Sequence, residues 1–116
     1  MMSTMHKAAA AVLVAAALVA SPAQAQSDEG PSISAVTMCA GAIAAHANLN
    51  VLTYPRGASG EWADLLGRVL AQLNTMEGVE GMTGRYAASA ARSHWAEQSA
   101  ADRRAAAQQC RERFGG

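Results

Sequence analysis

The chain has 116 residues, nine basic and nine acidic side chains, and a hydrophobic fraction of 51%. This length suits a single domain. Proteins that bind nucleic acids gain affinity by neutralising many phosphates, so the balanced charge argues against that function class.

The first 25 residues have the pattern of a secretion signal. A short segment containing Lys7 is followed by an apolar run over residues 8–20, and residues 21–25 (SPAQA) end in an A-x-A cleavage site. The apolar run is shorter than the roughly 20 residues of a membrane-spanning helix, although an uncleaved anchor or a buried helix is the alternative. We therefore predict a cleaved signal peptide over residues 1–25, a periplasmic or secreted location, and no membrane span in the mature chain.

The predicted mature chain carries its charges unevenly. It has eight Arg, no Lys and 19 Ala, a composition that indicates a GC-rich bacterial genome. Residues 26–80 have a net charge of −4, and residues 81–116 have a net charge of +3. This asymmetry predicts that the C-terminal helices pack across an acidic N-terminal half, and it leaves an arginine face for an anionic partner as the alternative.

The mature chain opens with a polar segment and an amphipathic helix. Residues 26–31 (QSDEGP) indicate a flexible lead-in. Apolar residues then recur at three- and four-residue steps, which predicts a helix over about 32–51. These apolar residues are Ile33, Val36, Ala40, Ile43, Ala47 and Val51. The small residues Gly41, Ala42 and Ala45 would let a neighbour approach closely, either the last helix or a second copy of the chain.

A turn and a strongly apolar helix follow. Pro55 disfavours helical geometry at Tyr54, and Gly57 tolerates positive φ, so the first helix ends before this run. A second helix begins near Gly60, with acidic residues in its first turn. We expect it at the centre of the core, because it has the heaviest apolar face: Trp62, Leu65, Leu66, Val69, Leu70, Leu73 and Met76.

The C-terminal third is also helical. Gly78, Gly81 and Gly84 indicate a loose connection. A third helix follows over about 83–98, with Met82, Tyr86, Ala90 and Trp95 expected to point inward. Ser99 and Asp102 form a helix-start pattern for a last helix over 100–114, although the third and fourth helices could form one bent helix.

These elements predict an all-α fold. No window alternates apolar and polar residues over more than a few positions, so strands are poorly supported. Short connections make successive helices run back against each other. We predict a small antiparallel three- or four-helix bundle over residues 32–114, closed by one disulfide and preceded by the signal peptide.

The disulfide prediction comes from the weak apolar content of the last helix. Between Ala87 and Arg113 the only large apolar side chain is Trp95. Cys39 and Cys110 are the only cysteines of an exported chain, where thiols are normally oxidised. A bridge would close a loop of about 72 residues and stabilise the fold by about 4.4 kcal/mol. An intermolecular bond or a redox-active pair is the alternative, although oxidoreductases usually have a Cys-x-x-Cys motif.

Catalytic, metal and cofactor motifs are weak. His46 and His94 could form a metal pair if their rings faced each other, but no His-x-x-x-His spacing supports this. Glu61 and Asp64 are explained by their place in the first turn of a helix. We therefore predict no catalytic residue, no metal ligand and no cofactor.

The remaining candidates lie on the predicted surface. They are an aromatic and a cation of the turn and three arginines of the last helix, residue types common at interfaces: Tyr54, Arg56, Arg103, Arg104 and Arg111. Tyr54 could alternatively fold back on the core. The sequence favours a non-catalytic periplasmic interaction module that binds an envelope protein, with no role in nucleic-acid binding and an open oligomeric state. A stress-responsive chaperone or holdase, and a small-ligand or metal binder, are the alternatives.

Overall fold

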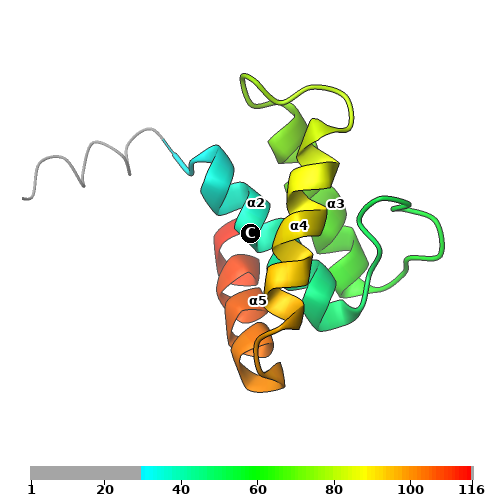
Figure 1. The fold of residues 1–116 in the computed structure, drawn as a ribbon, viewed down its shortest axis with the longest axis vertical. Coiled ribbons are helices and arrows are strands. Elements are labelled where there is room, and N and C mark those ends of the chain that lie inside the picture. Colours follow the sequence, from blue (N-terminus) through cyan, green and yellow to red (C-terminus); the bar gives the residue numbers. More distant parts are fainter. Residues whose placement is uncertain (1–29, 116) are drawn as a thin grey trace, which may run out of the picture. The chain divides into compact units, whose positions relative to one another are not determined.

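The computed structural model describes residues 30–115, so the expected signal peptide and most of the lead-in lie outside the described residues. The described part is all-helical, with four helices and no strand (Figure 1). The helices are α2 (Ile33–Ala47), α3 (Glu61–Asn74), α4 (Thr83–Ala96) and α5 (Ala100–Phe114). The last two are therefore separate helices. None of the four has the length and hydropathy needed to cross a membrane.

Short polar side chains define both ends of α2. The Ser32 hydroxyl accepts a hydrogen bond from the Ala35 N–H at 3.1 Å, which caps the helix start. The helix ends at Ala47, four residues before the predicted end, because Asn48 adopts a left-handed conformation with φ 57°. The Asn50 side chain then accepts hydrogen bonds from the next backbone N–H groups and stabilises a turn.

The last helix begins as predicted. The Ser99 hydroxyl accepts a hydrogen bond from the Asp102 N–H at 3.0 Å. Three residues, 97–99, connect α4 to α5. The cap explains why the chain forms two helices here rather than one bent helix, since the Ser99 backbone is extended with ψ 157°.

The core is centred on α2, whereas the sequence placed the second helix there. Helix α2 contacts each of the other three helices, and α3 contacts α4 and α5 less extensively. Helix α3 does contribute most of the large buried side chains, as predicted: Leu65, Leu66, Val69, Leu70 and Leu73. Trp62 and Met76 are partly buried at the edge of this cluster. Many small side chains on α2 allow its three neighbours to surround it.

Helices α2 and α4 cross with almost no side chain between them. A Cβ atom on Gly41 would lie 2.5 Å from the Ala91 Cβ and 2.6 Å from the Arg92 backbone nitrogen. Gly84, Ala88 and Ala91 are the buried residues of α4. At Gly41 the close neighbour is therefore α4, and not the last helix or a second copy of the chain.

This crossing overturns the predicted orientation of α4. Met82 and Tyr86 are 43% and 61% exposed, and Ala90 is exposed as well. Trp95 alone of the four predicted residues packs against the core, and it is partly buried. The large apolar residues are excluded from the interface because only Gly and Ala allow the two backbones to approach so closely.

Helix α5 has a small apolar face and a covalent link. Ala107 and Cys110 are its buried residues, and Phe114 packs against the core from a partly buried position. Cys110 pairs with Cys39 of α2, with the sulfur atoms 2.07 Å apart and the Cα atoms 5.5 Å apart. The sequence-based pairing of these cysteines is therefore confirmed at disulfide distance.

The contact at Gly41 predicts a destabilising substitution. We expect Gly41→Ala to lower the free energy of unfolding by about 1–3 kcal/mol, because the added methyl group must displace α4. Urea denaturation followed by circular dichroism measures this loss. Adding Ala91→Gly should recover only part of it, since backbone atoms of residues 91 and 92 also crowd the methyl group. A Gly41→Ala variant as stable as the parent would contradict the close approach.

The weak packing of α5 predicts dependence on the disulfide. Replacing both Cys39 and Cys110 by Ala should reduce the free energy of unfolding by up to about 4 kcal/mol. Limited trypsin digestion should then cut first at Arg103 and Arg104, since the helix that carries them loses its covalent link. The reduced parent protein should behave like the double variant. This prediction would be refuted if the protein isolated without reductant had two reactive thiols and α5 still resisted trypsin.

Candidate functional site

The α2–α3 connection is attached to two helices. The Tyr54 hydroxyl donates a hydrogen bond to the Ala63 carbonyl of α3 at 2.7 Å. Gly67 provides the space for this ring, because a Cβ atom there would collide with the Tyr54 hydroxyl. Tyr54 is thus partly buried against the domain. This is the alternative considered from the sequence, in which Tyr54 folds back on the core instead of anchoring an interface.

An arginine of α4 holds the same connection from the other side. The Arg85 guanidinium donates hydrogen bonds to the carbonyl oxygens of Val51 and Tyr54, at 3.0 and 2.5 Å, and lies 5.8 Å from the centre of the Tyr54 ring. Arg56 is exposed in this connection. The two predicted residues of the turn therefore differ, since the tyrosine is engaged within the domain and the arginine faces solvent.

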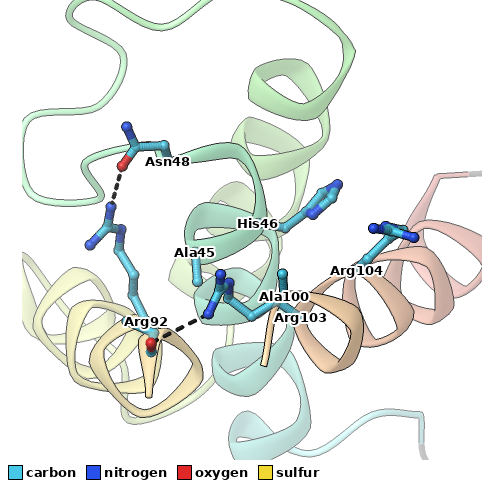
Figure 2. Close-up of a pocket in the computed structure, with 8 residues that line it drawn as sticks. Ala45, His46, Asn48, Arg92, Ala100, Arg103 and Arg104 are labelled. Carbon is cyan, nitrogen blue, oxygen red and sulfur yellow. Dashed lines mark hydrogen bonds between the residues drawn. The ribbon is translucent and has the colours of Figure 1, made fainter. Parts of the chain in front are cut away.

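Arginines from two helices line a hollow beside the end of α2, with Arg92 on one side and Arg104 on the other (Figure 2). The hollow has a volume of about 660 Å³. Arg92 of α4 and the predicted residues Arg103 and Arg104 of α5 supply its cations. The other lining residues are Ala45, His46, Asn48, Ala96 and Ala100. We call this site the basic hollow.

Hydrogen bonds to the backbone position two of these arginines. Arg92 donates from Nε to the Leu49 carbonyl at 2.7 Å and from Nη2 to Asn48 Oδ1 at 3.0 Å. Arg103 donates from Nη1 to the carbonyl oxygens of Ala96 and Gln98, at 3.3 and 2.5 Å. Since a guanidinium has five N–H donors, both side chains keep further donors for a ligand.

The basic hollow contains no compensating carboxylate from the described residues. No Asp or Glu lines it. Within residues 30–115, the ion pair formed at 4 Å or less joins Arg111 to Glu61 and does not involve the three arginines of the hollow. Glu97 and Asp102 neighbour the hollow in sequence but do not line it. Three arginines line this hollow and no Asp or Glu does, an arrangement that favours binding of a negatively charged group.

Arg111, the last of the five surface residues chosen from the sequence, lies beside the basic hollow. The Arg111 guanidinium is 4.8 Å from the centre of the Trp62 ring, and its Nη1 is 3.3 Å from Glu61 Oε1. The His46 ring, which lines the hollow, meets the same tryptophan edge-on with centroids 4.9 Å apart. Trp62 therefore connects Arg111 to the edge of the hollow. The ion pair is exposed and contributes little stability.

The two histidines contact different tryptophans. His46 contacts Trp62, and His94 contacts Trp95 with ring centroids 5.4 Å apart. Among the residues that the structure describes, no group of three or more His, Cys, Asp and Glu side chains could hold a metal ion. The chemistry that the arrangement offers is recognition of an anion by guanidinium groups.

Sequence reasoning missed Arg92 and Asn48. Arg85 and Arg92 are seven residues apart, which places them on one side of a helix. That spacing could have indicated that both side chains reach the α2–α3 connection. The pairing of Arg92 with the hollow depends on the α2–α4 crossing, and the sequence pattern did not predict that crossing.

Comparisons of the chain with protein-family models, with curated proteins and with solved structures found no match.

The contact between Tyr54 and α3 predicts a modest effect on stability. Tyr54→Phe should lower the free energy of unfolding by about 1 kcal/mol, because the hydroxyl loses its bond to the Ala63 carbonyl. Thermal denaturation measures the change. Tyr86→Phe is the matched control and should have no effect, since Tyr86 is 61% exposed. Equal stability of both variants would show that the Tyr54 hydroxyl does not contribute.

Proposed function

We propose that the protein is an exported, non-catalytic module that binds another protein of the bacterial cell envelope. The basic hollow is the observation that carries this proposal. Three arginines from α4 and α5 line it, and no carboxylate of the described residues neutralises them. Arginine is also a residue type enriched in the energetically dominant parts of protein interfaces.

Export is supported by the leader pattern and by the cysteine pair. Residues 1–25 match a secretion signal that ends in a small-residue cleavage site. A Cys39–Cys110 bridge is typical of proteins in an oxidising compartment such as the periplasm. In this proposal an antiparallel bundle serves as a rigid scaffold, and function depends on side chains that the helices present at its surface.

A small anionic ligand is the second candidate for the same site. The volume of about 660 Å³ lies within the range of small-molecule pockets, roughly 300–1,000 Å³. Apolar and aromatic side chains dominate most such pockets. Here alanines and cations form the wall instead, which favours a polar, charged partner group over a drug-like molecule.

Charge reversal at the hollow tests the proposed function. The tagged full chain should capture a specific protein from periplasmic extract, and Arg104→Glu should lose that protein because a carboxylate would repel its acidic group. Arg68→Glu is the matched control, since Arg68 is also exposed on a helix and changes the net charge equally. Mass spectrometry of the captured proteins provides the measurement.

The same capture experiment also tests whether the α2–α3 connection is the binding site. Arg56→Glu should retain the captured protein if the basic hollow is the binding site. Loss with Arg56→Glu but not with Arg104→Glu would move the interface to the connection. Capture of nothing above a control with a scrambled surface would refute the proposed function.

A further inference from the structure

A second, smaller hollow shares Arg92 with the basic hollow. It has a volume of about 160 Å³ and is lined by Asn50, Val51, Leu52, Ser89 and Arg92. Arg92 also lines the basic hollow. Arg92 is therefore shared by the two hollows, and a ligand that extends over it from one hollow to the other would contact both.

The two hollows differ in chemical character. The basic hollow has three arginines and His46 around it. The smaller hollow has Val51 and Leu52 in its wall, and Leu52 is 40% exposed although its side chain is large and apolar. An exposed leucine beside an arginine can accept an apolar group next to an anionic one.

We infer that the two hollows together bind an acidic peptide segment that continues into an apolar residue. The carboxylates contact Arg92, Arg103 and Arg104, and the apolar side chain packs against Leu52. This inference rests on the proposed function and gives the chemistry of the partner segment. Guanidinium groups suit carboxylates because they donate two parallel hydrogen bonds.

A peptide fits the arrangement better than a compact anion. A single phosphate or carboxylate ion would contact a small part of a volume of about 660 Å³ and would leave the smaller hollow empty. A nucleic-acid strand would place further phosphates beyond Arg92, where the wall is formed by Val51, Leu52 and polar neutral residues. An acidic segment with an apolar neighbour matches both parts.

Fluorescence anisotropy with the purified full chain tests this inference. The probe is a labelled peptide of four glutamates followed by two leucines. Two comparison peptides carry glutamines in place of the glutamates or serines in place of the leucines. We expect the probe to bind, both comparison peptides to bind at least tenfold more weakly, and added phosphate or citrate to compete only weakly.

Variants of the protein test the two hollows separately. Arg104→Glu should weaken probe binding at least tenfold, and Leu52→Ser should remove the advantage of the leucines over the serines. Arg68→Glu should bind as the parent does. The Arg104 side chain forms no hydrogen bond with the described residues, so its substitution should leave the circular dichroism spectrum unchanged.

Several outcomes would overturn the inference. These are no probe binding at millimolar concentration, equal weakening by Arg104→Glu and Arg68→Glu, or full competition by phosphate or citrate. Probe binding without any captured envelope protein would support the peptide site over the two hollows and refute the proposed function. Capture of an envelope protein that does not depend on Arg104 would support a binding role, but it would move the interface away from the basic hollow and refute the inferred peptide site.

Discussion

The close approach of α2 and α4 at Gly41 sets the position of α4 and, through it, the basic hollow. At this position the α4 backbone occupies the space that a side chain would fill, with the Arg92 nitrogen 2.6 Å from the site of a Cβ atom. The Arg92 side chain therefore starts next to the crossing and reaches the end of α2. Further along the same two helices, Ala45 and Ala96 line the basic hollow. Small residues thus create both the contact and the adjoining space.

Much of the fold was predictable because local rules govern it. Ser32 and Ser99 cap their helices as such residues commonly do. The buried face of α3 follows from its helical periodicity. The pairing of Cys39 with Cys110 followed from the need to hold a helix with few apolar side chains.

The orientation of α4 was not predictable from its own residues. Met82 and Tyr86 are the larger apolar side chains, and a hydrophobicity pattern places them inside. Their exposure results from the distance between two backbones, a property of the pair of helices rather than of either one. Arg103 and Arg104 could be chosen as candidate residues from the composition of the last helix alone. Arg92 could not, because its place at the hollow depends on how α2 and α4 cross.

The hydrogen bonds of Arg92 and Arg103 to backbone carbonyls also affect the entropy of binding. Long arginine side chains usually lose rotamer freedom when a partner immobilises them, at a cost of about 0.5–1.5 kcal/mol for each side chain. Here much of that freedom is already lost when the chain folds, because Leu49, Ala96 and Gln98 hold the guanidinium groups. Binding of an anionic group here therefore has a lower entropic cost than binding on a surface where the arginine side chains move freely.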